Sequence, residues 1–509
     1  MITNSLLPFK LEIEKKDQGL TGLSGLPVYY ELACVSGLIK KFKEHLSFLD
    51  TSQGWHGSTI AGALVLLNLA GGDCVEDIDK LEGDDGLRRI FKKAEFHDLP
   101  RKERRVAMTR FRKGKNRAFP SKSVIFRYLS KFHSSDEELF REEGKAFIPN
   151  PTRGLRGLEQ VNREQIQYLQ DQHPETTATL DMDATLIETH KREAQYCYKH
   201  HKAYQPLNTY WYEQGVILHT EFRDGNVPAG FDQLRVFKES LESLPTGIER
   251  VYLRSDTAGY QHDLLKYCDG GLHPRYGKIA FAICCDVTES FKRAVREVPK
   301  KDWHPIYNEI NGKKVESGRE WAEVCFVPNK ICSSKKGMDY RYLAIREVLR
   351  QPDLPGMEPQ QELPFPTMTV EKTRFKLFGV VTNIHDWDGE RVIKWNRERC
   401  GNSEHAHGVM KNDLAGGRFP CENFGANAAW WWIMILALNL NEMMKILALD
   451  PNWRPKRMKA IRYWLINVPG RVIKHSRQLR LRLPENHPSN ELICRMRYCV
   501  AQLAAAAPG

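Results

Sequence analysis

Two aspartates stand two residues apart in the stretch "TATLDMDATLIETH" (177–190), which otherwise has the composition of a buried strand. Because side chains alternate between the two faces of a strand, Asp181 and Asp183 project from the same face. Two carboxylates roughly 6–7 Å apart repel each other, and burying them is costly unless a positive group lies beside them. We therefore expect a positive partner at this strand, and a divalent metal ion is the partner we favour.

Two further acids could join this pair. Asp256 follows the apolar run in "YLRSDTAGY", and Glu404 lies in the helical stretch "RERCGNSEHAHGVMK". Clustered carboxylates can hold two Mg²⁺ ions about 4 Å apart, which activate a water or a 3′-hydroxyl for in-line phosphoryl transfer. The candidate catalytic and metal-binding residues are Asp183, Asp256 and Glu404, with Asp181 as a possible additional ligand. Mn²⁺ is expected to substitute for Mg²⁺.

The elements that must position these acids alternate between strands and helices. The predicted order is a strand at 177–187, two strands or a hairpin at 209–226, a helix at 231–244, a strand at 248–260, a helix to about 268 and a strand at 277–287. This order predicts a mixed sheet with helices on its faces. Acids on the first and fourth strands, with a third acid on a late helix, are the layout of an RNase H-like α/β fold, in which those two strands are neighbours.

The composition of the flanking regions suggests five parts of the chain. They are a helical DNA-binding or dimerisation region (1–150), the first part of the RNase H-like core (151–287), a β-rich insertion (288–390), the C-terminal helices of the core (391–450) and a basic helical tail (451–509). The apolar stretch 428–449 is interrupted by polar residues, so we expect a core helix and no membrane span.

The charge balance indicates a polyanionic partner. The chain has 76 Lys and Arg against 64 Asp and Glu, a net charge of +12. Residues 91–130 hold 13 basic and 3 acidic side chains, and residues 451–484 hold 10 basic and no acidic ones. In the second stretch Arg471, Lys474, Arg477 and Arg480 recur every three residues, which predicts one cationic helix face. We expect double-stranded DNA as the partner. Residues 91–130 would recognise specific DNA ends, and residues 454–482 would hold the DNA backbone.

The candidate DNA-binding residues combine these basic stretches with residues near the acids. They are Arg101, Lys102, Arg104, Arg105, Arg110, Arg112, Lys113, Lys115, Arg117, Lys122, Arg127, Trp303, Arg399, Lys411, Arg471, Lys474, Arg477 and Arg480. Trp303, in "KKDWHPI", is a candidate for stacking on an extruded base. Two loosely zinc-like groups, Cys197 with His200 and His201, and Cys400 with His405, His407 and Cys421, lack standard ligand spacing.

The motifs "LDMDAT", "LRSDTAGY", "VVTN" and the helix with Arg399, Glu404 and Lys411 resemble the DDE transposases of bacterial insertion sequences, in the group related to piggyBac transposases. The resemblance covers roughly residues 20 to 450. It implies a β-rich insertion between the second and third acids, and Mg²⁺-dependent DNA cleavage and strand transfer by a homodimer. The bound DNA would be terminal inverted repeats and target DNA. The acids lie 73 and 148 residues apart, and the longer gap accommodates the insertion.

Two positions depart from the family signature. Trp395 stands where Tyr is usual, and Arg399 lies one residue farther before Glu404 than usual, whereas Lys411 falls in place. Glu422 therefore remains an alternative third acid, and Asp181 an alternative first acid, although "Asp-Ala-Thr" at Asp183 matches the family better.

The sequence as a whole predicts a cytoplasmic, nucleoid-associated cut-and-paste DNA transposase. Its twelve cysteines form no CxxC pair, as is typical of free thiols, and its N-terminus has no signal-peptide pattern. A nuclease without strand transfer, or a domesticated DNA-binding protein without catalysis, remain the alternatives.

Overall fold

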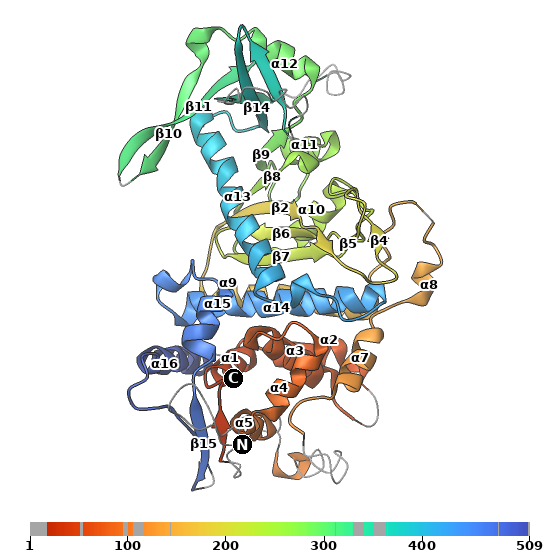
Figure 1. The fold of residues 1–509 in the computed structure, drawn as a ribbon, viewed down its shortest axis with the longest axis vertical. Helices are drawn as coiled ribbons and strands as arrows, with labels where there is room; N and C mark the ends of the chain where they lie inside the picture. The colour runs from red at the N-terminus through yellow and green to blue at the C-terminus, as the bar shows by residue number, and fades with distance from the viewer. Residues whose placement is uncertain are drawn as a thin grey trace, which may run out of the picture.

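The fold is mixed α/β and is built around one large sheet. The computed structural model describes residues 18–506 except 51–53, 95–99, 105–116, 143, 311, 329–339, 350–362, 364 and 477. Figure 1 shows an elongated molecule with a β-rich part at one end, the centre of the sheet in the middle and a helical layer at the other end. The ten-stranded sheet runs in the order β10-β11-β12-β14-β9-β8-β2-β6-β7, with β13 paired to β14.

The centre of the sheet follows the predicted strand order. Its strands are β2 (Thr177–Ala184), β6 (Leu207–Trp211), β7 (Val216–Glu221), β8 (Arg250–Ser255) and β9 (Ala280–Cys285). β2 pairs in parallel with β8 and antiparallel with β6, and β8 pairs in parallel with β9. The first and fourth predicted strands are thus neighbours. Helices α10 (Gln233–Glu242) and α11 (His262–Asp269) connect these strands, and β3 (Ile187–Glu188), β4 (Gln195–Tyr196) and β5 (Lys202–Tyr204) form a small separate sheet.

The region 288–390 is rich in strands, and these strands continue the central sheet. It contains α12 (Glu289–Arg296), β10 (His304–Ile310), β11 (Lys313–Val324), β12 (Arg341–Val348), β13 (Thr367–Val370) and β14 (Thr373–Thr382). β14 pairs antiparallel with β9, so the predicted insertion shares backbone hydrogen bonds with the core. Helix α13 (Gly389–Asn412) then runs back along the sheet (Figure 1).

A long buried helix separates the sheet from the helical layer. α14 (Phe424–Ala448) packs on β7 on one side and on α1 (Leu26–Val35), α3 (Gly57–Ala70), α7 (Lys122–Ser130) and α9 (Arg153–Gln172) on others. The layer also holds α2 (Leu38–Leu46), α4 (Ile78–Gly83), α5 (Asp85–Ala94) and α8 (Ser135–Glu138). By length and composition α14 could cross a membrane, as could the bent pair Gly57–Ala70 and Val75–Gly83 taken as one span. However, 83% of the apolar window of α14 is buried inside the fold, as expected of a core helix.

The same helix satisfies the backbone of the last strand of the sheet. Asn439 Oδ1 accepts a hydrogen bond from the Ile217 amide on β7 (2.9 Å), and its Nδ2 donates to the Ile217 carbonyl (2.8 Å) and to Asn162 Oδ1 on α9 (2.8 Å). An unpaired strand edge invites pairing with another chain. At Ile217, a side-chain amide takes the place of a neighbouring strand.

The prediction of a wholly helical tail is wrong at residues 470–482. β15 (Gly470–His475) and β16 (Gln478–Arg482) form an antiparallel hairpin, and β15 also pairs with β1 (Leu20–Thr21). The alternation of apolar and basic residues has the strand period of two, and the positive φ of Ser476 (48°) suits a two-residue hairpin turn. The tail is helical on either side, in α15 (Met458–Ile461), in a π-helical segment (Arg462–Ile466) and in α16 (Asn490–Ala506). Exposed Arg471, Lys474 and Arg480 therefore lie on strands, and Arg477 lies outside the described residues.

A buried histidine ties three elements together. His219 on β7 lies between Glu159 of α9 (3.5 Å from Nδ1) and Glu239 of α10 (3.3 Å from Nε2). Burial acts to lower the pKa of His219, but the two carboxylates outweigh burial and raise it from 6.5 to about 9. The imidazole is thus a cation at neutral pH, held between two anions.

This geometry predicts a pH-dependent stability. A histidine whose pKa is higher in the folded state stabilises the fold fully below pH 6.5, and this contribution is lost as the pH rises through about 9. At about 1.4 kcal/mol per pKa unit, the loss is on the order of 3 kcal/mol. Urea unfolding across this range should show the loss in the wild type and in the control His262→Gln, which changes an exposed histidine. His219→Gln should lack it, and parallel curves for His219→Gln and the wild type would contradict the assignment.

Candidate active site

Two of the predicted acids meet where β2 and β8 end. Met182 lies opposite Ser255 in the parallel pair, so Asp183 and Asp256, the next residues, lie side by side. Burial raises the pKa of Asp256, and the neighbouring charge of Asp183 raises it further. The strand ends therefore hold two carboxylates that resist being charged together.

The turn after β8 explains the sequence around Asp256. Asp256 caps the short helical turn Thr257–Gly259, and its Oδ1 accepts a hydrogen bond from the Ala258 amide (2.9 Å). The turn folds back on the strand so closely that a Cβ on Gly259 would lie 2.5 Å from Ser255 Oγ. Only glycine allows this approach, so the "SDTAG" segment holds Asp256 at the strand end.

The positive partner of Asp181 is an arginine, which corrects our expectation of a metal ion at that residue. Arg254 lies opposite Asp181 in the β2–β8 register and binds both carboxylate oxygens, with Nε–Oδ1 at 2.6 Å and Nη2–Oδ2 at 2.9 Å. Both side chains are fully buried. Arg254 also donates to the Trp395 carbonyl of α13 (2.7 Å), and the Tyr212 ring lies 4.7 Å from its guanidinium carbon. Asp181 thus connects the sheet to α13.

Helix α13 covers Asp183 with a row of side chains four residues apart. Arg399 Nη1 lies 3.4 Å from Asp183 Oδ2, Ser403 Oγ donates to the same oxygen (3.2 Å), and His407 Nδ1 is 3.8 Å from it. Burial still raises the pKa of Asp183, because it outweighs the opposing effects of Arg399 and Ser403. The carboxylate is oriented from one side, and its charge is only partly compensated.

A chain of hydrogen bonds orients His407 from the opposite side. The Trp431 indole N–H donates to Thr220 Oγ1 (2.9 Å), Thr220 donates to Asn208 Oδ1 (2.7 Å), and Asn208 Nδ2 lies 3.2 Å from His407 Nε2. Because an indole N–H can only donate, the direction of the chain is set, and Nε2 of a neutral His407 accepts. Burial, with nearby cations, lowers the pKa of His407 to about 3, so the ring is neutral and turns its Nδ1–H toward Asp183. The sequence indicates this histidine only as a member of a loosely zinc-like group.

The third predicted acid does not contact the other two. Glu404 is exposed on α13, one residue and therefore about 100° round the helix from Ser403. Among the described residues no hydrogen-bond or ion-pair partner of Glu404 is found, and it forms no close three-ligand group with Asp183 and Asp256. The alternative, Glu422, accepts from the Arg192 amide (2.7 Å) and pairs with Lys191 (3.5 Å). The structure thus brings together Asp183 and Asp256 only.

Comparison with known proteins identifies the family. The family model described as Transposase DDE domain group 1 matches residues 8–505. The chain belongs to this transposase family. No curated protein matches it. The chain is also similar to a piggyBac transposase in a synaptic complex with hairpin DNA, with 10% identity, 97% of this chain and 85% of that chain covered, and a TM-score of 0.41. The predicted DDE transposase family is confirmed, and an insertion-sequence origin stays a prediction.

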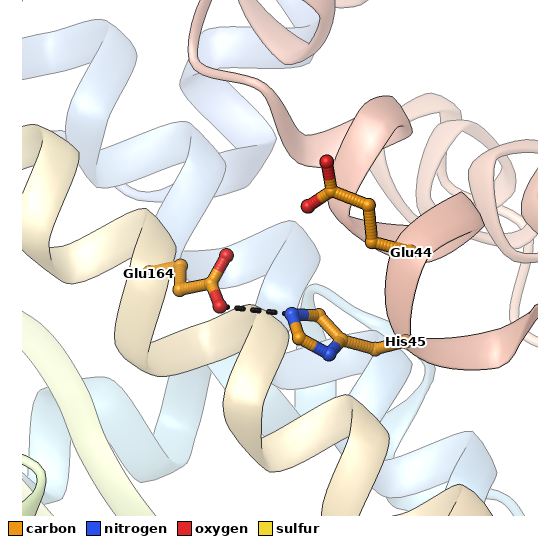
Figure 2. A group of neighbouring side chains, drawn as sticks. All are labelled: Glu44, His45 and Glu164. Carbon is orange, nitrogen blue, oxygen red and sulfur yellow. Dashed lines mark hydrogen bonds and ion pairs between the residues drawn. The ribbon is translucent and has the colours of Figure 1, made fainter.

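Two other groups of potential metal ligands lie in the described part of this transposase. In the first, Glu164 of α9 binds His45 Nε2 (2.8 Å) and faces Glu44, both of α2 (Figure 2). The Lys41 ammonium lies 2.7 Å from Glu164 and 3.1 Å from Glu44, so a side-chain cation already neutralises this group. The group is an ion-pair network that joins α2 to α9. The second group is Asp73, Cys74 and Asp77, and neither zinc-like set forms such a group within the described ranges.

The predicted DNA-binding residues of the first basic stretch divide into three sets. Arg101, Lys102 and Arg104 are exposed, whereas Arg105, Arg110, Arg112, Lys113 and Lys115 lie outside the described residues. Lys122 and Arg117 reach Asp79, at 2.9 and 3.6 Å, so these two side chains also stabilise the helical layer. Arg127 is exposed on α7.

Trp303 differs from the expected stacking platform. It is buried (7% exposed), and the Arg346 guanidinium carbon lies 3.8 Å from its ring centroid. One ring face therefore already has a cationic partner, and a DNA base could stack there only after Arg346 moves. Its part in DNA binding stays a prediction.

The Asp181–Arg254 pair yields a prediction that separates support from catalysis. Asp181→Asn removes the carboxylate that binds Nε and Nη2 of the buried Arg254 and leaves it the half-exposed Glu398, whose Oε2 lies 3.3 Å from Nη1. This loss should cost about 3 kcal/mol of stability in urea unfolding, the lower end for breaking a buried ion pair. Asp183→Asn, the matched change two residues away, removes a partly exposed acid and should cost much less. Equal stability of Asp181→Asn and the wild type would contradict the structural role. The double variant Asp181→Leu/Arg254→Met should recover most of the loss.

Proposed function

We propose that the chain is a cut-and-paste DNA transposase with an RNase H-like core, which cleaves the ends of its element and joins them to target DNA. The observation that carries this proposal is the side-by-side placement of Asp183 and Asp256 under α13, the helix that also bears Arg399, Glu404 and Lys411, in a chain of the DDE transposase family. The adjacency of β2 and β8 supports the RNase H-like assignment.

The acids suit a divalent cation chemically. Asp183 and Asp256 are hard oxygen donors whose pKa values burial raises, and their mutual repulsion is relieved by a cation between them. Asp183, Asp256 and Glu404 would hold the metal, which requires Glu404, exposed on α13, to turn toward the two aspartates. Two bound Mg²⁺ or Mn²⁺ ions would supply Lewis-acid activation of the attacking and leaving oxygens.

The side chains around the acids have separate tasks in this proposal. Ser403 donates a hydrogen bond to Asp183 Oδ2, and His407 Nδ1 faces the same oxygen at 3.8 Å, so the two side chains keep Asp183 in one orientation. Arg399, which partly compensates the charge of Asp183 in the absence of substrate, would turn its guanidinium toward a phosphate oxygen of bound DNA. Lys411, farther along α13, offers a point charge to a neighbouring phosphate. Exposed Arg101, Lys102, Arg127, Arg471, Lys474 and Arg480 would hold the DNA, and a homodimer would bring two ends together.

The proposal predicts which acids are essential. DNA carrying the gene's own flanking sequences, incubated with Mg²⁺ or Mn²⁺, should be nicked at defined positions by the wild type. Asp183→Asn, Asp256→Asn and Glu404→Gln should each lower cleavage by at least about a thousandfold, because each removes a ligand that stabilises the transition state. Gel analysis of cleavage and strand-transfer products on supercoiled target DNA measures both steps.

Asp286→Asn is the matched control, since this exposed acid follows the next parallel strand, β9. It should cleave like the wild type. Activity retained by Glu404→Gln would move the third ligand elsewhere, with Glu422→Gln tested next. Cleavage without joining would indicate a nuclease, and salt-sensitive binding without any cleavage would indicate a non-catalytic DNA-binding protein.

A further inference from the structure

A basic recess lies at the C-terminal end of α13. Three segments that are far apart in the sequence form it: the loop after α3, the end of α13 with the turn that follows, and the stretch leading into and through α15. Its volume is about 550 Å³, in the range of ligand sites. Its charged lining residues are Asp73, Lys411, Asp413, Arg418, Arg457, Lys459 and Arg462.

The positive charge of this recess exceeds what the protein itself neutralises. Five cationic side chains face two carboxylates. The Asp413 side chain is fully buried and accepts hydrogen bonds from Arg457 Nη2 (2.7 Å) and Arg457 Nε (3.0 Å). Asp73 pairs with Arg418 (3.1 Å). Both carboxylates are therefore already paired, and three positive charges remain.

Two of the remaining cations, Lys411 and Lys459, are available to a ligand, and Arg418, which is 73% exposed and pairs with a 45% exposed Asp73, can exchange this surface partner for a phosphate. Lys411 has no hydrogen-bond or ion-pair partner among the residues that the structure describes. Lys459 has a 68% exposed side chain, and its nearest carboxylate oxygen, on Asp413, is 3.7 Å away. By contrast, Arg462 donates to the carbonyls of Asn68 and Leu69 (2.7 and 2.9 Å) and so caps the end of α3.

The backbone of the recess is shaped by glycine. A Cβ on Gly417 would lie 2.3 Å from the Lys411 carbonyl, so the turn after α13 can fold back under the helix end only with glycine there. Gly71, with a φ of 97°, ends α3 in the left-handed conformation and lies against Arg462. The turn at Gly417 brings Arg418 to the recess beside Lys411, and the turn at Gly71 brings Asp73 there.

The recess adjoins the acid pair. Lys411 lies one helical turn beyond His407, the residue that faces Asp183. A DNA strand with one phosphodiester at Asp183 and Asp256 would therefore carry a neighbouring phosphate toward Lys411.

We propose that this recess binds the phosphodiester backbone of the DNA strand next to the bond that is cut, through Lys411, Arg418 and Lys459. This proposal rests on the proposed transposase function and adds to it a specific phosphate-binding site. Arg418 was not singled out from the sequence, whereas Arg457 and Lys459 lie in the stretch 454–482 that was expected to hold the DNA backbone. Because phosphates carry no sequence information, the recess would fix the position of the strand without reading its bases.

The experiment measures how DNA affinity of the full chain depends on salt. Fluorescence anisotropy gives Kd across a series of KCl concentrations, for a duplex with the gene's flanking sequence and for an unrelated duplex. Each lost phosphate contact should reduce the slope of log K against log salt by about 0.9. Arg418→Gln and Lys459→Gln should each show this loss, and the double variant roughly twice as much, equally on both duplexes.

Controls separate this site from a general effect of charge. Arg418→Lys keeps the charge and should keep the wild-type slope. Lys40→Gln, which changes a 76% exposed lysine on α2, should also leave the slope unchanged. Arg418 and Lys459 are 73% and 68% exposed, so their replacement should not alter the urea-unfolding midpoint.

The outcomes distinguish this proposal from the function on which it rests. If the wild type binds and cuts DNA while the double variant keeps its slope, the recess proposal is overturned and the transposase function stands. An equal loss of slope in Lys40→Gln would also overturn it. So would a double variant that keeps the wild-type slope but differs from the wild type in oligomer mass without DNA, because the recess would then bind a second copy of the chain. A wild type with neither salt-dependent binding nor cleavage would overturn both.

Discussion

The buried pair of Asp181 and Arg254 is the interaction on which the site depends. The two residues lie opposite each other on neighbouring parallel strands, with no exposure to solvent, and Arg254 also holds the Trp395 carbonyl of α13. A slip of one residue between β2 and β8 would turn one of the charges away from its partner. Because an unpaired buried charge is so costly, the pair strongly favours one register, and that register sets Asp183 beside Asp256.

The electrostatic balance at the strand ends follows from this arrangement. Asp181 on β2 is paired with Arg254 on β8, whereas Asp183 and Asp256, the next acids along these two strands, have Arg399 nearby together with Ser403 and a neutral His407. The fold therefore holds two incompletely compensated carboxylates side by side, which is electrostatically unfavourable. Interactions around the site offset this cost, among them the chain of hydrogen bonds that begins at Trp431 of α14 and passes through Thr220. A site of this kind is prepared for a positive ligand before that ligand arrives.

Much of this arrangement could be predicted from the sequence because it depends on local patterns. The strand order followed from runs of β-branched and aromatic residues, and the adjacency of Asp183 and Asp256 followed from the order. Arg254 could have been predicted as the partner of Asp181 in the same way. Arg254 stands two residues before Asp256 and Asp181 two residues before Asp183, so the two lie opposite each other once Asp183 and Asp256 are adjacent. The tail could not be assigned from the spacing of its cations, because residues 470–482 fit both a period near three and a period of two. The orientation of Glu404 depends on the rotation of α13 about its axis, which its weakly amphipathic sequence does not determine.

The pairing of β1 with β15 has a consequence for how the chain is made. Residues Leu20–Thr21 complete their sheet only with Gly470–His475, and α1 packs against α16. During synthesis β1 and α1 therefore emerge long before the segments that cover them, and this side of the helical layer is completed only after nearly the whole chain has left the ribosome. A product truncated before residue 470 would lack these partners. Such a product would leave the edge of β1 unpaired and part of α1 uncovered, so this side of the helical layer should be less stable and more prone to pair with other chains.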